Sequence, residues 1–189
     1  MLMPPVLVAA GAPQDQVRQT VDKLLALLAD PQLRGADKAN ERREELRKVL
    51  YARFDFTEMA KRALGPHWQG RSPEEQKEFV ELFTSLLEGA YLDKIESYNG
   101  EQVQYLDETV ENDYAEVDTK IVDNHGQPFS VNYRLRNGGG DWQVYDVAIE
   151  NVSLVNNYRS QFNRVLAKSS FEELLKTMKE KVSAPDKKR

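Results

Sequence analysis

The stretch PFSVNYRLRNGGGDWQVYDVAIENVSLVNNYRSQF, residues 128–162, decides the fold. Apolar and polar residues alternate from Phe129 to Arg136, and this period of two predicts a strand with one apolar face. Asn137 and the three glycines at 138–140 interrupt the alternation. Because glycine accepts positive φ without a Cβ clash, they predict a hairpin turn. From Trp142 to Ile149 apolar residues fall on both sides of a second strand, so we expect both of its faces to be covered.

Beyond this second strand the pattern changes from strand spacing to helix spacing. Apolar residues between Val152 and Leu166 recur at intervals of three and four, which is typical of a helix with one buried face. Asn151, Ser153 and Asn156 precede or open that segment. Their side-chain oxygens can accept hydrogen bonds from the first helical amides, so a helix is predicted to begin here.

The remaining segments predict helices before the sheet and after it. Apolar stripes indicate helices after Pro13 as far as Asp30, from about Asp37 to Phe54, over 56–64 and from Pro73 for about six turns, with starts marked by Asp55 and by Ser72 to Glu75. Two further strands are predicted around Val103 and over 114–122, and a last helix follows Ser170. The predicted fold class is α+β, with a four-stranded antiparallel sheet packed against and capped by several helices.

Composition restricts the classes of partner. The 189 residues include 31 acidic and 26 basic residues, giving a net charge of −5. Nucleic acid and a general anionic membrane surface are therefore poor electrostatic partners. The chain has no cysteine, which excludes disulfides and thiolate metal sites. No run approaches the roughly 18 apolar residues that span a bilayer.

Length and terminal composition predict one domain. Leu2 to Ala10 is uncharged and apolar, and Ala10-Gly11-Ala12 has the small-x-small form of a signal-peptidase site, although no basic residue precedes it. Residues 1–12 are therefore interpreted as a signal-peptide remnant or a disordered N-terminus. Residues 13–183 are expected to form a single domain, and 184–189 a polar tail.

The chemistry of catalysis is not visible in the sequence. His67 falls in a predicted loop and His125 in a predicted turn, where spacing places neither beside a nucleophile or a metal ligand. The glycines at 138–140 precede a strand and not a helix, so they do not form a phosphate-binding loop. We expect no enzyme activity, no metal site and no cofactor.

Several separated segments resemble one family. Trp142 with 144–147, then 152–155 and 157–162, is similar to the signature of the toluene-tolerance (MlaC) family. Asp55-Phe56 with 59–60, 64–65 and Trp68 also matches, and the resemblance covers roughly residues 17 to 180. One departure is Asn151, which stands where relatives often have glycine.

This resemblance implies a hollow interior. Periodicity alone favours a solid core between the apolar sheet face and the helix stripes. In the family, sheet and helices instead enclose an apolar cavity that takes the acyl tails of a phospholipid, with the head group near the mouth. Tyr91 and Val152 are expected in the cavity from their places in the matching motifs, and the other positions from their faces. The predicted lipid-binding residues are Phe83, Leu87, Tyr91, Ile95, Tyr105, Val117, Ile121, Val131, Tyr133, Val144 and Val152.

The resemblance also implies a function. It predicts a periplasmic carrier that takes phospholipid as cargo and shuttles it between membranes. The implied partners are an inner-membrane ring of lipid-binding domains attached to an ABC transporter, and an outer-membrane lipoprotein complex. Two alternatives stay open: a carrier of another apolar lipid, such as a hopanoid or sterol-like molecule, and a solid-cored interaction module without a ligand.

Overall fold

The computed structural model describes residues 11–123 and 125–184. The expectation of a signal-peptide remnant falls almost wholly on residues 1–10, and that of a polar tail on 185–189, so both lie outside the described residues.

The described helices follow the predicted segments closely. They are α1 (Pro13–Ala29), α2 (Ala39–Arg53), α3 (Phe56–Leu64), α4 (Pro73–Glu96), α5 (Leu154–Leu166) and α6 (Phe171–Ser183), with short 3₁₀ helices η1 (Pro31–Leu33), η2 (Ala36–Lys38) and η3 (Gly65–Trp68). The expected start signals are confirmed: Ser72 and Glu75 form a complete capping box on α4, and the Asp55, Ser153 and Ser170 side chains cap α3, α5 and α6.

The sheet has five strands, one more than predicted. It runs β1 (Gln102–Glu111), β2 (Tyr114–Val122), β3 (Pro128–Asn137), β4 (Trp142–Ile149) and β5 (Val152–Ser153), as an antiparallel meander in that order. The fifth strand exists because Glu150 and Asn151 both adopt positive φ, 48° and 63°. These two residues form a two-residue hairpin turn that brings Val152 opposite Ile149. Asparagine tolerates this conformation better than most residues, so the turn forms without glycine.

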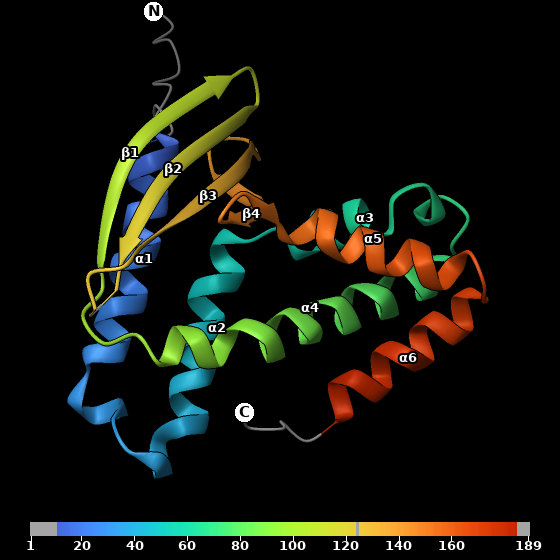
Figure 1. The fold of residues 1–189 in the computed structure, drawn as a ribbon, viewed down its shortest axis with the longest axis horizontal. Helices are drawn as coiled ribbons and strands as arrows, with labels where there is room; N and C mark the ends of the chain where they lie inside the picture. Colours follow the sequence, from blue (N-terminus) through green and yellow to red (C-terminus); the bar gives the residue numbers. More distant parts are fainter. Residues whose placement is uncertain (1–10, 124, 185–189) are drawn as a thin grey trace, which may run out of the picture.

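The buried apolar residues form two clusters, which we call the sheet core and the helical core. One lies between the sheet and α1 and has Val117, Leu135 and Val144 at its centre. The other lies among α3, α4, α5 and α6, where Phe79 and Phe83 stack on each other. In Figure 1 the sheet and α1 stand at one end and α5 and α6 at the other, with α4 running between them. Phe54 and Tyr91 pack against both cores and so connect them.

A buried carboxylate connects the sheet to the start of α5. Asp146 on β4 is 3% exposed and accepts hydrogen bonds from the Ser153 hydroxyl at 2.6 Å and the Val155 amide at 3.1 Å. Arg134 on β3 supplies a positive charge at 3.3 Å. Because a buried carboxylate needs such partners, this cluster fixes the start of α5 against the sheet.

Candidate functional site

A cavity of about 440 Å³ lies between the sheet and the helices. This volume falls within the range of about 300–1,000 Å³ that is usual for small-molecule sites. The sheet contributes Val103, Ile121, Phe129, Val131, Tyr133, Val144, Val147 and Ile149. The first helix contributes Val17, Thr20, Val21, Leu24, Leu25 and Leu28. The rest of the wall is Leu50, Tyr51, Arg53, Phe54, Phe56, Met59, Leu87, Glu88, Tyr91, Leu92, Lys94, Ile95, Tyr98, Glu101 and Leu154.

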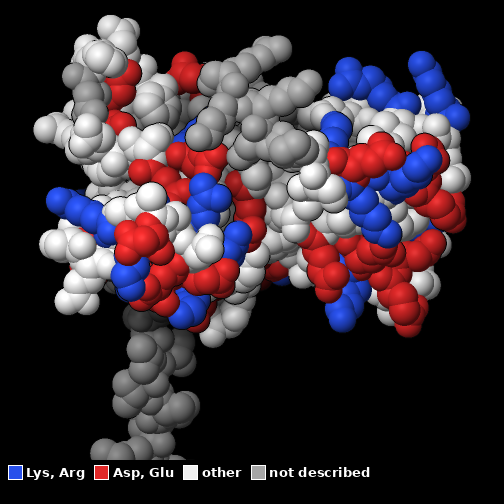
Figure 2. Space-filling view, turned by 90° about the horizontal axis from the view of Figure 1, so that it is seen from below, with Lys and Arg blue, Asp and Glu red and all other residues white. Residues whose placement is uncertain are grey.

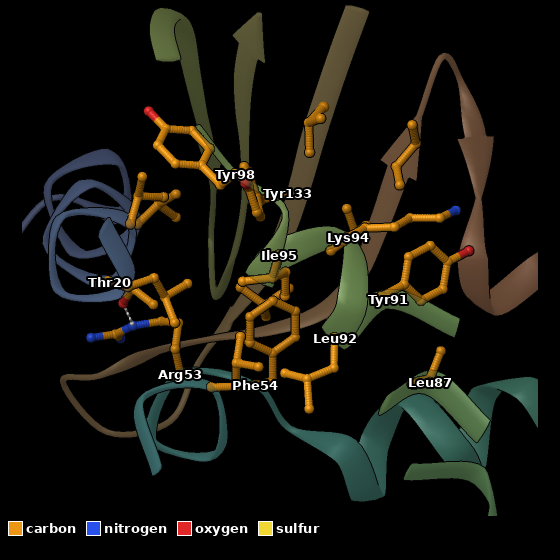
Figure 3. Close-up of a pocket in the computed structure, with 18 of the residues that line it drawn as sticks. Thr20, Arg53, Phe54, Leu87, Tyr91, Leu92, Lys94, Ile95, Tyr98 and Tyr133 are labelled. Carbon is orange, nitrogen blue, oxygen red and sulfur yellow. Dashed lines mark hydrogen bonds between the residues drawn. The ribbon is translucent and has the colours of Figure 1, made fainter. Parts of the chain in front are cut away.

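The wall is mostly apolar, and its cationic groups lie toward the margins of the view in Figure 3. Arg53 donates to the Thr20 hydroxyl at 3.1 Å and also to the Gln16 side chain and the Trp142 carbonyl. Burial lowers the pKa of Arg53, but these bonds tie the guanidinium to α1 and β4. Lys94 extends away from Ile95, with its ammonium 5.1 Å from the centre of the Tyr91 ring. The centre of the cavity is therefore suited to hydrocarbon and not to a charged group.

Ion pairs hold the wall segments of α2 and α4 together. Glu96 accepts from Arg42 at 2.9 Å and from Arg43 at 2.7 Å, and Glu88 pairs with Arg47 at 3.0 Å. We call these five residues the α2–α4 clasp. Viewed from below, this side of the molecule shows acidic and basic side chains interspersed, without a large area of one sign (Figure 2). Long side chains thus join two helices whose apolar faces border the cavity.

Tyr51 extends this contact at the edge of the cavity. Its hydroxyl donates to Glu88, and burial followed by this hydrogen bond raises the pKa of Tyr51 to about 12. Tyr51 is still 48% exposed. Tyr51 therefore belongs to the rim, with one side on the cavity and the other in water.

The structure brings seven of the eleven predicted residues to the cavity wall. They are Leu87, Tyr91, Ile95, Ile121, Val131, Tyr133 and Val144. Their position fits the prediction, and their contact with a lipid stays a prediction.

The other four predicted residues do not line the cavity. Phe83 is fully buried in the helical core, because the first half of α4 packs on α3 and α6 and only its second half faces the cavity. Val117 is fully buried in the sheet core, and Tyr105 packs at the edge of that core. Val152 is 56% exposed and lies in a separate polar surface groove with Ser153 and Arg134, because the turn at 150–151 directs it outward.

Two parts of the wall were not among the predicted site residues. The apolar stripe of α1, including Val21, Leu24 and Leu28, is visible in the sequence, but its spacing is that of any core-facing helix. Leu50 and Phe54 at the end of α2 also line the cavity. Whether an apolar stripe packs fully into a core or borders a cavity depends on the folded structure, so the sequence alone could not show it.

The described residues provide neither a metal-binding cluster nor a helix that could span a membrane. Within 11–123 and 125–184, no group of three or more His, Cys, Asp or Glu side chains could hold a metal ion. Over the same ranges, none of the helices is both long enough and apolar enough to cross a membrane. His67 and His125 are exposed, and neither lines the cavity.

The fold and the cavity define a class of protein, an α+β domain with an apolar cavity between a sheet and its covering helices. Comparison with known families agrees with this class. The model of the family described as MlaC protein matches residues 18–180, and the chain belongs to this family.

Individual relatives show the same similarity. The chain is 23% identical to the intermembrane phospholipid transport system binding protein MlaC of Haemophilus influenzae, over 94% of this chain and 86% of that protein. It is 27% identical to the toluene tolerance protein ttg2D of Pseudomonas putida, over 84% and 75%. Among solved structures, the phospholipid-binding protein from Ralstonia solanacearum in complex with a phospholipid superposes with a TM-score of 0.83 at 26% identity, covering 91% of this chain and 97% of that one.

Proposed function

We propose that this protein is a lipid carrier that holds the acyl chains of a phospholipid in the cavity between sheet and helices. The observation that carries the proposal is the apolar cavity of about 440 Å³. The similar Ralstonia protein was solved with a phospholipid bound, and the Haemophilus relative is named as the binding protein of a phospholipid transport system. The open volume argues against a solid-cored interaction module.

The energetics of lipid transfer explain what such a cavity does. Moving one methylene group from an apolar environment into water costs about 0.8 kcal/mol, so two bare tails with about thirty methylenes would cost on the order of 20 kcal/mol. An enclosed apolar wall removes most of this barrier. Because the cavity replaces one apolar environment with another, loading from a membrane is nearly neutral in free energy. The direction of transport then comes from the partners.

The proposed setting is the periplasm, and the proposed partners are the two membrane complexes between which a carrier shuttles. These are an inner-membrane ring of lipid-binding domains attached to an ABC transporter, and an outer-membrane lipoprotein complex. Membership of the MlaC family supports both assignments. The phospholipid is cargo and not a cofactor, and we propose a binding function without catalysis.

A charge placed in the wall tests this function. Ile95 lies at the centre of the cavity view (Figure 3) and is half-buried, so Ile95→Glu would force a carboxylate against the acyl chains. We expect this variant to lose transfer of a fluorescent phospholipid between donor and acceptor vesicles. Val152→Glu is the matched control, because Val152 is exposed outside the cavity. Equal transfer by the wild type and Ile95→Glu would overturn the proposal.

A further inference from the structure

Two tyrosines stand on the cavity side of the sheet. Tyr105 on β1 is opposite Thr119 on β2, and Thr119 is opposite Val131 on β3. Tyr133 is two residues beyond Val131, so it lies on the same face of the sheet. Tyr133 lines the cavity directly, whereas Tyr105 packs at the edge of the sheet core behind it.

The hydroxyl of Tyr105 has no partner. It is buried, and no group among the described residues forms a hydrogen bond with it. Burial raises the pKa of Tyr105 to about 12. Arg18 stacks over the ring, with its guanidinium carbon 4.1 Å from the ring centre, so the cation contacts the ring face. A buried hydroxyl without a partner costs free energy, so its presence in an apolar core needs an explanation.

Tyr133 places a second phenol at the wall of the cavity. Burial, and next the nearby phenol of Tyr105, raise its pKa, and no hydrogen bond contributes to the shift. The residue is nevertheless only half-buried. Because Tyr133 lines the cavity, part of its surface faces that open volume. Figure 3 shows Tyr133 beside the strands of the sheet, apart in the view from Arg53 at the lower left.

Several other hydroxyls around the cavity differ from this pair because they have a protein partner, whereas the Tyr91 phenol, also in the wall, lies beside the Lys94 ammonium. The Thr119 hydroxyl donates to the Val131 carbonyl at 2.7 Å. At the rim, the Tyr51 hydroxyl donates to Glu88 and the Tyr98 hydroxyl to the Glu101 carbonyl. The two sheet tyrosines therefore form a neutral polar spot in an apolar wall, with hydrogen-bonding capacity left for a ligand.

We propose that the Tyr133 hydroxyl, with Tyr105 behind it, hydrogen-bonds an uncharged oxygen within the apolar part of the cargo. This inference rests on the proposed carrier function and adds a specificity determinant to it. A phosphate or carboxylate is unsuited to the spot, because both phenols are neutral and Arg18 stacks on the face of the Tyr105 ring and does not line the cavity. Two cargo oxygens have the required chemistry: the carbonyl of an acyl ester and the hydroxyl of a ring lipid.

The experiment compares three probes by titration calorimetry. They are a short-chain phospholipid with two ester-linked tails, its counterpart with two ether-linked tails, and a sterol-like lipid with one hydroxyl. Tyr133→Phe removes only the hydroxyl and breaks no protein hydrogen bond, so it should fold as the wild type does. Tyr145→Phe is the matched control, since Tyr145 on β4 does not line the cavity and its ring contacts Arg62.

We expect Tyr133→Phe to weaken the binding of either the ester-linked phospholipid or the sterol-like lipid about tenfold, equivalent to about 1.4 kcal/mol. Binding of the ether-linked phospholipid should be unchanged. Loss for the ester lipid identifies the carbonyl as the recognised oxygen, and loss for the ring lipid identifies its hydroxyl. Tyr105→Phe should weaken binding of the same probe to a smaller extent, and Tyr145→Phe should change the binding of none.

The inference is overturned if Tyr133→Phe binds all three probes as tightly as the wild type, or more tightly. Tighter binding is the expected sign if the hydroxyl stays without a partner in the complex, because phenylalanine removes a desolvation cost. A wild-type protein that binds none of the probes would refute the carrier function itself, which is a separate result.

Discussion

Substitutions at two valines on the same face of the sheet can distinguish a hollow interior from a solid one. Val131 lines the cavity, and Val117 on the neighbouring strand is fully buried outside it. The substitutions Val131→Phe and Val117→Phe each add four carbon atoms to a side chain in nearly the same sheet environment. Only the first has open volume to receive them.

The expected effects on stability differ in sign. Overpacking a filled core costs about 1–3 kcal/mol, so Val117→Phe should lower the free energy of unfolding by about 1–3 kcal/mol. Filling a cavity commonly adds about 0.5–2 kcal/mol, so Val131→Phe should leave the stability unchanged or raise it. Urea unfolding of the two lipid-free variants measures this difference.

The same ring takes space from the cargo. If the four added carbons displace about four methylenes of an acyl chain, binding of a short-chain phospholipid from water should weaken by about 3 kcal/mol, or roughly 100-fold. Titration calorimetry measures this loss. Equal destabilisation by both substitutions, together with unchanged lipid binding in Val131→Phe, would refute the assignment of Val131 to a hollow wall.

Three further predictions concern the clasp, the turn and the sheet tyrosines. Glu96→Gln replaces the carboxylate shared by Arg42 and Arg43, so we expect a loss of about 1–3 kcal/mol in urea unfolding that shrinks as salt is added; a salt-independent loss would contradict the clasp. Asn151→Gly should match the wild type in thermal unfolding, whereas Asn151→Val should lower stability by about 1–3 kcal/mol because a β-branched residue is strained at a φ of 63°. Burial raises the pKa of Tyr105 from 10.0 to about 12, so the folded state favours the protonated phenol. The contribution of this phenol to stability is therefore present below pH 10 and declines as the pH rises toward 12. Tyr105→Phe should flatten this decline in urea unfolding at pH 9 to 11.5, and a pH profile identical to that of the wild type would count against the prediction.

Local signals in the residues were enough to predict most of the fold. The alternation on both sides of Asn137, the capping box at Ser72 and the caps at Asp55 and Ser170 correspond to elements that the structure contains. The short fifth strand was missed because its formation depends on positive φ at Glu150 and Asn151. Neither residue type marks such a turn as strongly as glycine does.

The cavity itself could not be predicted from periodicity. Phe83 and Leu87 lie one turn apart on the same stripe of α4 and both belong to the helical core, yet only Leu87 also lines the cavity. Val117 and Val131 show the same ambiguity on the sheet. An apolar residue has the same pattern whether its neighbour is another side chain or an empty space, so only the resemblance to a family pointed to hollowness.

Native mass spectrometry of the protein, purified without detergent from a host that has membranes, tests the central claim most directly. We predict a population whose mass exceeds that of the polypeptide by the mass of a phospholipid, and its removal by solvent extraction should restore the polypeptide mass. The account is contradicted if only the bare polypeptide mass is found and incubation with phospholipid vesicles adds no lipid.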